Sequence, residues 1–236
     1  MLPRLAVLVR IRHVGDGRRG EGGLRRLRLH AVEAALERVG EGIRVRVRDW
    51  TEEDLVDYEA WIMPPAGGGE HEWQRTDGPF YPNFTAEGAQ RWLGTLREHV
   101  TAGDWPDPRE TMVIADAADD RFIGQVSWYW SEKPTEDPGD GTHLLPLRSL
   151  GITVYSPEHW SGGYGTEAMR LWIDYLFAHS DSHRLDLETW SGNAGMCRVA
   201  VKLGFTEEAR IRRARRVGGE YYDRMVYGVL REEWQG

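Results

Sequence analysis

Residues 159–177, HWSGGYGTEAMRLWIDYLF, place three glycines within four positions immediately before a run with helical periodicity. The first turn of a helix presents unpaired backbone N–H groups and a partial positive charge. Glycines just before such a turn let the backbone close around a bulky anion, so that several N–H groups converge on phosphate oxygens. The stretch SGGYGTEA, residues 161–168, therefore predicts a phosphate-binding turn at the start of a helix over about 164–179.

Strand and helix signals alternate on both sides of this turn, which predicts a mixed α/β sheet. Thr51 and Thr85 each precede a helical pattern and are typical helix N-caps. Residues 61–84 are rich in Pro, Gly and aromatics, and residues 131–146 are polar, so both segments are predicted to be long loops. Alternating apolar residues predict strands from Ile43 and at about 110–116, 121–130, 147–155, 184–190, 205–212 and 221–229, with a further helix at about 194–203.

Charge divides the chain into two parts. Residues 1–48 carry a net charge of +7, and residues 49–236 carry −15. We expect a basic, flexible extension over 1–42, containing a short helix, ahead of one domain over 43–236. The basic part lacks interleaved aromatics and any groove-reading motif, and the acidic body disfavours nucleic acid and favours a cationic ligand such as an amine.

Cysteine content and hydropathy indicate the cellular environment of the protein. Cys197 is the single cysteine, so no intrachain disulfide and no cysteine-rich zinc site are expected. No apolar run approaches the ~18 residues of a membrane span, and the N-terminus lacks a signal-peptide core. We therefore expect a soluble, cytoplasmic protein with no membrane partner. His179 and His183 have no third ligand nearby, and no metal is expected.

A dinucleotide-binding fingerprint is the main alternative for the glycine cluster. Gly163, Gly165 and Ala168 spell G-x-G-x-x-A, and Glu188 follows 20 residues later at the end of a strand. However, the segment SPEHWSG separates the preceding strand from the first glycine, and hairpin strands come before it. Binding of NAD in preference to coenzyme A would favour this alternative.

Two linked motifs resemble the GNAT superfamily of N-acetyltransferases, and more narrowly its RimJ/RimL-type branch. The first is SPEHWSGGYGTEAMRLWIDYLF (156–177), where Gly163 and Gly165 occupy the small positions of the signature Q/R-x-x-G-x-G/A and Trp160 replaces its leading residue. The second is RLDLETWSGNAGMCRVAVKLGFTEEARIRR (184–213). The resemblance is strong from about 147 to 236, fair from 43 to 130 and absent in 1–42.

The resemblance implies a mostly antiparallel central sheet with splayed strands, flanked by helices, and acetyl-CoA as the cosubstrate. The pyrophosphate would lie on the amides of the glycine turn. The pantetheine arm would run along the strand before it, and Asn193 would bond the arm or cap its helix. The implied cofactor-binding residues are Ile152, Thr153, Val154, Gly162, Gly163, Tyr164, Gly165, Thr166 and Asn193.

The catalytic residues are less well marked by the motifs. The family's usual acid, a Tyr, falls at Ala200, and the Ser that some RimJ/RimL-type members carry falls at Met196. Glu188 is the candidate general base, since it shares a strand face with Asp186 and Trp190, although an ordinary ion pair is the alternative. Cys197 is expected to face elsewhere, as a small buried hydrophobe.

The amine side is expected to be formed by the two long loops. Trp73, Phe80 and Tyr81 are the candidate substrate-side residues, and they could equally anchor their loop to the core. The basic run 210–216 is open to three roles: contact with the 3′-phosphate of coenzyme A, contact with an acidic peptide, or simple solvation. Acids that could make the mouth of the site negative are Asp77, Glu132, Glu136 and Asp137.

We therefore expect direct transfer of an acetyl group from acetyl-CoA to a primary amine, either a protein N-terminus or a small molecule. Because both usual acid positions lack a hydroxyl, the alternative is a non-catalytic acyl-CoA-binding or regulatory module of the same fold. A homodimer is compatible with the family resemblance.

Overall fold

The computed structural model describes residues 44–236, apart from 66, 84, 137–138 and 140. The predicted extension over 1–42, with its short helix, lies outside the described residues. The elements follow the order β1 (Val45–Arg48), α3 (Glu52–Ile62), α4 (Glu72–Asp77), α5 (Ala86–Ala102), β2 (Thr111–Asp116), β3 (Phe122–Glu132), β4 (Leu147–Val154), a 3₁₀ turn (Pro157–His159), α6 (Tyr164–His179), β5 (Arg184–Trp190), α7 (Ala194–Lys202), β6 (Thr206–Val217) and β7 (Glu220–Leu230).

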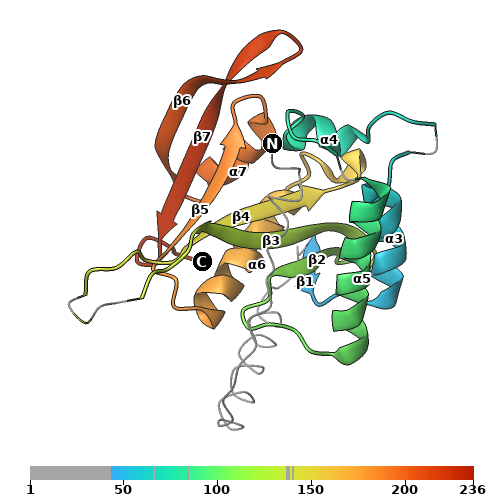
Figure 1. The fold of residues 1–236 in the computed structure, drawn as a ribbon, viewed down its shortest axis with the longest axis horizontal. Helices are drawn as coiled ribbons and strands as arrows, with labels where there is room; N and C mark the ends of the chain where they lie inside the picture. The colour runs from blue at the N-terminus through green and yellow to red at the C-terminus, as the bar shows by residue number, and fades with distance from the viewer. Residues whose placement is uncertain (1–43, 66, 84, 137–138, 140) are drawn as a thin grey trace.

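The strands form one sheet in the order β1-β2-β3-β4-β5-β7-β6 (Figure 1). Every neighbouring pair is antiparallel except β4 and β5, which are parallel. The sheet is continuous through this parallel pair for only two residue pairs, Arg148 with Leu185 and Ser149 with Asp186. The mixed α/β sheet with splayed strands is thus confirmed.

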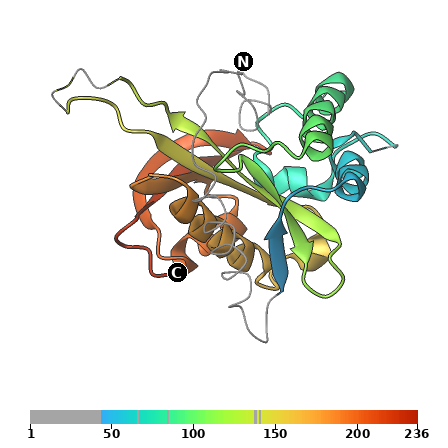
Figure 2. The ribbon, with the colours of Figure 1, turned by 90° about the horizontal axis from the view of Figure 1, so that it is seen from below.

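Helices cover both faces of the sheet, with α6 on one side and α3 with α5 on the other (Figure 2). The face toward α6 and α7 carries the larger core, in which Trp172 of α6 is fully buried and donates from Nε1 to the carbonyl of Ser127 on β3 at 3.1 Å. The other face packs α3, α4 and α5 around Tyr58 and Tyr155, both almost fully buried. Alternation along each strand assigns its side chains to one layer or the other.

Local signals set most helix boundaries as expected. Thr51 caps α3 with a reciprocal capping box through Asp54, and the Thr85 hydroxyl accepts from the amide of Gly88 at the start of α5. Helix α6 covers residues Tyr164–His179, as predicted. Among these residues, no helix has the length and apolar character that spanning a bilayer requires.

Two sequence-based expectations need correction. The segment 61–84 is not loop throughout, because His71 starts α4 and Trp73 anchors that short helix in the core at 5% exposure. Strands β6 and β7 are also longer than predicted and form an extended hairpin. The basic run 210–216 lies within β6, where the register shifts between Ile211 and Arg215.

Candidate functional site

The separation of β4 from β5 creates the site. Beyond the Ser149–Asp186 pair, the edge of β4 through Ile152, Thr153 and Val154 is paired with no strand on the β5 side within the described residues. Its other edge is fully paired with β3. Trp160 holds the end of the strand, since its Nε1 donates to the carbonyl of Val154 at 2.8 Å. A free edge of backbone donors and acceptors suits an extended, amide-bearing chain.

A groove follows this free edge to the start of α6. Gly163 is the N-cap of α6 with φ +93°, and no side chain caps the helix there. The amides of Tyr164, Gly165 and Thr166 lack intrahelical partners, as at any helix start, and among the described residues no acceptor is bonded to them. The groove lining includes Ile152, Thr153, Val154, Gly163, Gly165, Thr166 and Asn193.

The structure therefore brings seven of the nine expected cofactor-binding residues to one groove. The other two, Gly162 and Tyr164, belong to the same turn but do not line it. The Tyr164 ring packs edge-on against His159, with centroids 5.0 Å apart. Asn193 also takes the capping role considered for it, because its Oδ1 accepts from the amide of Met196 at 3.0 Å.

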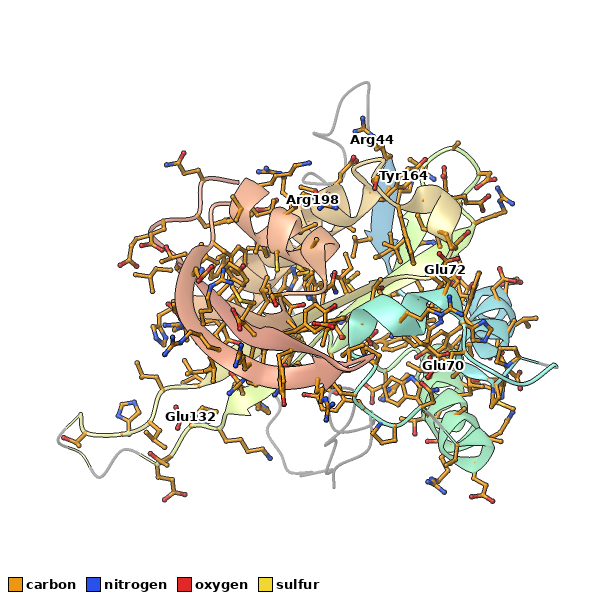
Figure 3. The ribbon with its side chains drawn as sticks, turned by 90° about the horizontal axis from the view of Figure 1, so that it is seen from above. Arg44, Glu70, Glu72, Glu132, Tyr164 and Arg198 are labelled. Carbon is orange, nitrogen blue, oxygen red and sulfur yellow. The ribbon has the colours of Figure 1, made fainter. Side chains whose placement is uncertain are left out.

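Two cations that the sequence analysis did not single out also line the groove. Arg198 and Lys202 lie one turn apart on α7, both exposed, across from the start of α6. Figure 3 shows Arg198 and Tyr164 on the same side of the molecule. The groove holds about 1390 Å³ of empty space, open solvent included. Open helix amides, two cations and a free strand edge fit a ligand with a pyrophosphate and an amide-bearing arm.

A second cavity joins the groove at the split between β4 and β5. Six residues line both spaces: Trp73, Asp77, Ile152, Thr153, Asn193 and Met196. We call the first space the donor groove and the second the acceptor pocket. The three candidate substrate-side residues, Trp73, Phe80 and Tyr81, all line the acceptor pocket. Phe80 also packs edge-on against Trp190 at 5.9 Å, so these aromatics line the pocket and anchor their segment together.

Glu188 lines the acceptor pocket within a cluster of charges. Its Oε1 accepts from Nε of Arg224 at 2.6 Å, and its Oε2 accepts from Nη2 of the same guanidinium. Nη2 of Arg215 lies 3.3 Å from Oε1. Trp190 of the same strand also lines this pocket and Asp186 does not, and the ion-pair alternative for Glu188 is realised. Its role as a base stays a prediction.

A row of polar groups extends across β3, β4 and β5, and Tyr129 is the member of this row that lines the acceptor pocket. The hydroxyl of Ser149 on β4 lies close to both the Tyr129 hydroxyl on β3 and the Asp186 carboxylate on β5. Ser131 donates to Asp186 at 2.9 Å. Burial raises the pKa of Tyr129 to about 12, and burial also raises the pKa of Asp186. Tyr129 is thus a neutral hydroxyl facing the pocket at neutral pH.

The expected acids do not gather at the mouth. Asp77 lines both spaces, whereas Glu132 and Glu136 are exposed and line neither. Figure 3 places Glu132, the last residue of β3, beside the projecting segment and away from Glu72 of α4. Asp137 lies outside the described residues. Within the part of the chain that is described, no three His, Cys, Asp or Glu side chains gather as a metal site would require.

The positions of the usual family acids are clear in the fold. Ala200 is fully buried in the core beneath α7, and Met196 lies at the junction of the two spaces. Cys197 lines neither space, and its Sγ lies 3.8 Å from the carbonyl of Trp190. Of the basic run 210–216, Arg215 alone lines one of these two spaces, and it lines the acceptor pocket and not the donor groove.

Comparison with known proteins agrees with this geometry. Residues 44–206 match the family model "Acetyltransferase (GNAT) domain". The chain is 28% identical over 147 residues, 62% of this chain and 74% of the relative, to "Probable N-acetyltransferase YjcK" of Bacillus subtilis. It is 32% identical over 90 residues, 38% of this chain and 49% of the relative, to "Putative ribosomal N-acetyltransferase YdaF" of the same organism.

Solved structures share the fold at lower identity. The ribosomal-protein-S5-alanine acetyltransferase of Vibrio fischeri aligns with a TM-score of 0.56 at 19% identity, over 84% of this chain and 98% of the other. The spermidine N-acetyltransferase of Vibrio cholerae, in complex with CoA and spermine, aligns with a TM-score of 0.55 at 16% identity, over 82% and 99%. The chain belongs to the GNAT family and is an acetyltransferase enzyme.

Proposed function

We propose that this protein transfers an acetyl group from acetyl-CoA to a primary amine by direct attack of the amine. The observation that carries the proposal is the continuity of the donor groove with the acceptor pocket through the split between β4 and β5. Such a passage brings a donor in the groove within reach of an acceptor in the pocket. Coenzyme A would supply an acyl thioester, which a neutral amine attacks.

On the donor side, the chain's own groups have separate tasks. The amides of residues 164–166 and the helix dipole of α6 would hold the pyrophosphate. Arg198 and Lys202 would add charge-assisted bonds to phosphate oxygens. The free edge of β4 at Ile152–Val154 would pair with the pantetheine amides, and this pairing would place the thioester at the split.

On the acceptor side, the pocket would hold the amine. Glu188 is the candidate base for the ammonium, either directly or through water. Because neither Ala200 nor Met196 can donate a proton, the thiolate would leave with only weak acid assistance. The acceptor would be a protein N-terminus or a small-molecule amine. The proposal also includes membership of the RimJ/RimL-type branch and a cytoplasmic location.

Calorimetric titration with acetyl-CoA, with NAD as the paired control, tests the donor. Saturable binding of acetyl-CoA without binding of NAD is expected, and the reverse would favour a dinucleotide enzyme. Turnover is then measured over a broad panel of amines by release of free thiol. Tight acetyl-CoA binding with no turnover of any amine would favour the non-catalytic acyl-CoA-binding module.

A further inference from the structure

Arg215 is a charged side chain of the acceptor pocket for which the proposed reaction gives no task. It extends from β6 over the ring of Phe80, with its guanidinium carbon 4.9 Å from the ring centroid. Its side chain is 22% exposed, and it lines the pocket together with Tyr129 and Glu188. A cation on an aromatic face in a partly desolvated pocket is held in place before any ligand arrives.

The charges around Arg215 do not cancel. Arg224 already bonds both oxygens of Glu188, and Arg215 makes the longer contact, at 3.3 Å, to the same carboxylate. The cluster of Arg215, Arg224 and Glu188 has one carboxylate for two guanidinium groups, while a second acid, Asp77, lines the pocket elsewhere.

Hydrogen-bond donors on Arg215 are also left over. Its Nη1 donates to the carbonyl of Ala214 at 3.1 Å, and its Nε is buried without a partner among the described residues. A guanidinium has five N–H donors in a rigid fork that matches the two oxygens of a carboxylate. Excess charge and unused donors thus occur together on one side chain that faces the pocket.

We propose that Arg215 binds a carboxylate of the acceptor, so that the preferred substrate is a primary amine that also carries a carboxylate. The inference rests on the proposed function and narrows its acceptor. The carboxylate could belong to a free amino acid or to an acidic residue near the amino end of a peptide.

Binding to the coenzyme A-saturated protein tests the inference without requiring turnover. Dissociation constants are measured by calorimetry for amino acids against the amines left by their decarboxylation, and for peptides starting Asp-Ala against Asn-Ala. We expect at least one of the two carboxylate classes to bind roughly tenfold or more tightly than its partner, the loss of one charge-assisted bond. Whichever pair shows the preference identifies the source of the carboxylate.

Variants on β6 complete the test. Arg215→Gln is expected to bring the ratio close to one, and Arg215→Lys to give an intermediate ratio, because it keeps the charge and loses the fork. Arg212→Gln is the matched control, since Arg212 is exposed on the same strand and lines neither space. Thermal melting of each variant checks folding.

Two results would overturn the inference: equal binding of both members of every pair by the wild type, or a preference that survives Arg215→Gln. Failure of the proposed function would give a different result. In that case the wild type would prefer the carboxylate-bearing ligands and Arg215→Gln would lose this preference, but the wild type would acetylate no amine.

Discussion

Ser149 of β4 and Asp186 of β5 form the last residue pair before these two strands separate. Their polar side chains also lie close together, and both residues are buried, at 1% and 8% exposure. Ser131 adds a second hydroxyl to the Asp186 carboxylate at 2.9 Å. The polar cluster thus fixes the point from which the donor groove and the acceptor pocket open.

Asp186→Asn is expected to gain stability relative to the wild type as pH rises. Burial raises the pKa of Asp186 above its ordinary value of about 3.9. Between the unfolded and folded pKa values the folded protein binds more protons, so the wild type loses stability as pH increases through that window. The Asn variant does not titrate. Denaturant unfolding of both proteins at about pH 4 and pH 7 checks this, and a difference independent of pH would contradict it.

Gly163→Ala is expected to weaken acetyl-CoA binding through the backbone. A Cβ at Gly163 would lie 3.6–3.7 Å from Arg44, which is ordinary contact, so no clash occurs. The φ of +93° is the obstacle, and adopting it costs an L-residue about 1–2 kcal/mol. If the backbone at residue 163 rotates to relieve that strain, the amides at the start of α6 no longer converge on a phosphate. Calorimetry measures the dissociation constant.

Gly219→Ala is the control for Gly163→Ala. Gly219 has φ +91° with nothing within 4 Å, and it lies in the β6–β7 turn, outside both spaces. Both variants are expected to lose similar stability, and only Gly163→Ala to lose affinity. Equal acetyl-CoA affinity in the two variants would show that the turn at Gly163 does not hold the phosphates.

The parts of the fold that the sequence predicts are those set by local physics. The glycines ahead of α6, the threonine caps of α3 and α5 and the alternation in β5 each act within a few residues. The motif order around Gly163 and Asn193 adds the family resemblance, and from it the splayed strands. The donor groove could thus be outlined before the structure.

The acceptor pocket could not be assembled in this way, because its walls come from distant segments. Arg215 reaches Phe80 and Glu188 only because β6 folds back beside β7. Short helix α4 was missed because six residues give too little periodicity, and its position depends on Trp73 packing against Tyr155 at 5.2 Å. Arg198 and Lys202 are two cations one turn apart on the helix predicted at about 194–203, and this spacing is the sequence signal for them.

Arg198→Gln combined with Lys202→Gln is expected to weaken acetyl-CoA binding at least tenfold, because two charge-assisted bonds to phosphate oxygens are lost. The salt dependence of binding should fall with them. Calorimetry at two ionic strengths measures both effects. Arg97→Gln is the control, since it removes an exposed cation of α5 that pairs with Glu52 at 3.4 Å. If Arg97→Gln weakened acetyl-CoA binding in the same way, the result would indicate a long-range effect of net charge instead of contact between α7 and the phosphates.

Glu188→Gln separates a base from a structural ion pair. If Glu188 deprotonates the acceptor, kcat falls by about 10²–10⁴ at neutral pH while the affinity for acetyl-CoA is kept. Raising the pH then recovers part of the rate, because more of the amine is already neutral. If Glu188 only pairs with Arg224 and Arg215, the melting temperature falls and kcat changes little.

Glu207→Gln supplies the matched comparison for that experiment. Glu207 makes a similar two-point pair, with its Oε1 2.9 Å from Nε of Arg210 and its Oε2 3.0 Å from Nη2, and it lines neither space. The melting temperature and kcat of Glu207→Gln show the effect of breaking a carboxylate–guanidinium pair on this hairpin. A kcat that falls for Glu188→Gln alone, with recovery at high pH, assigns the base. Equal kcat in the two variants would falsify the assignment and leave the neutral amine to form in solution.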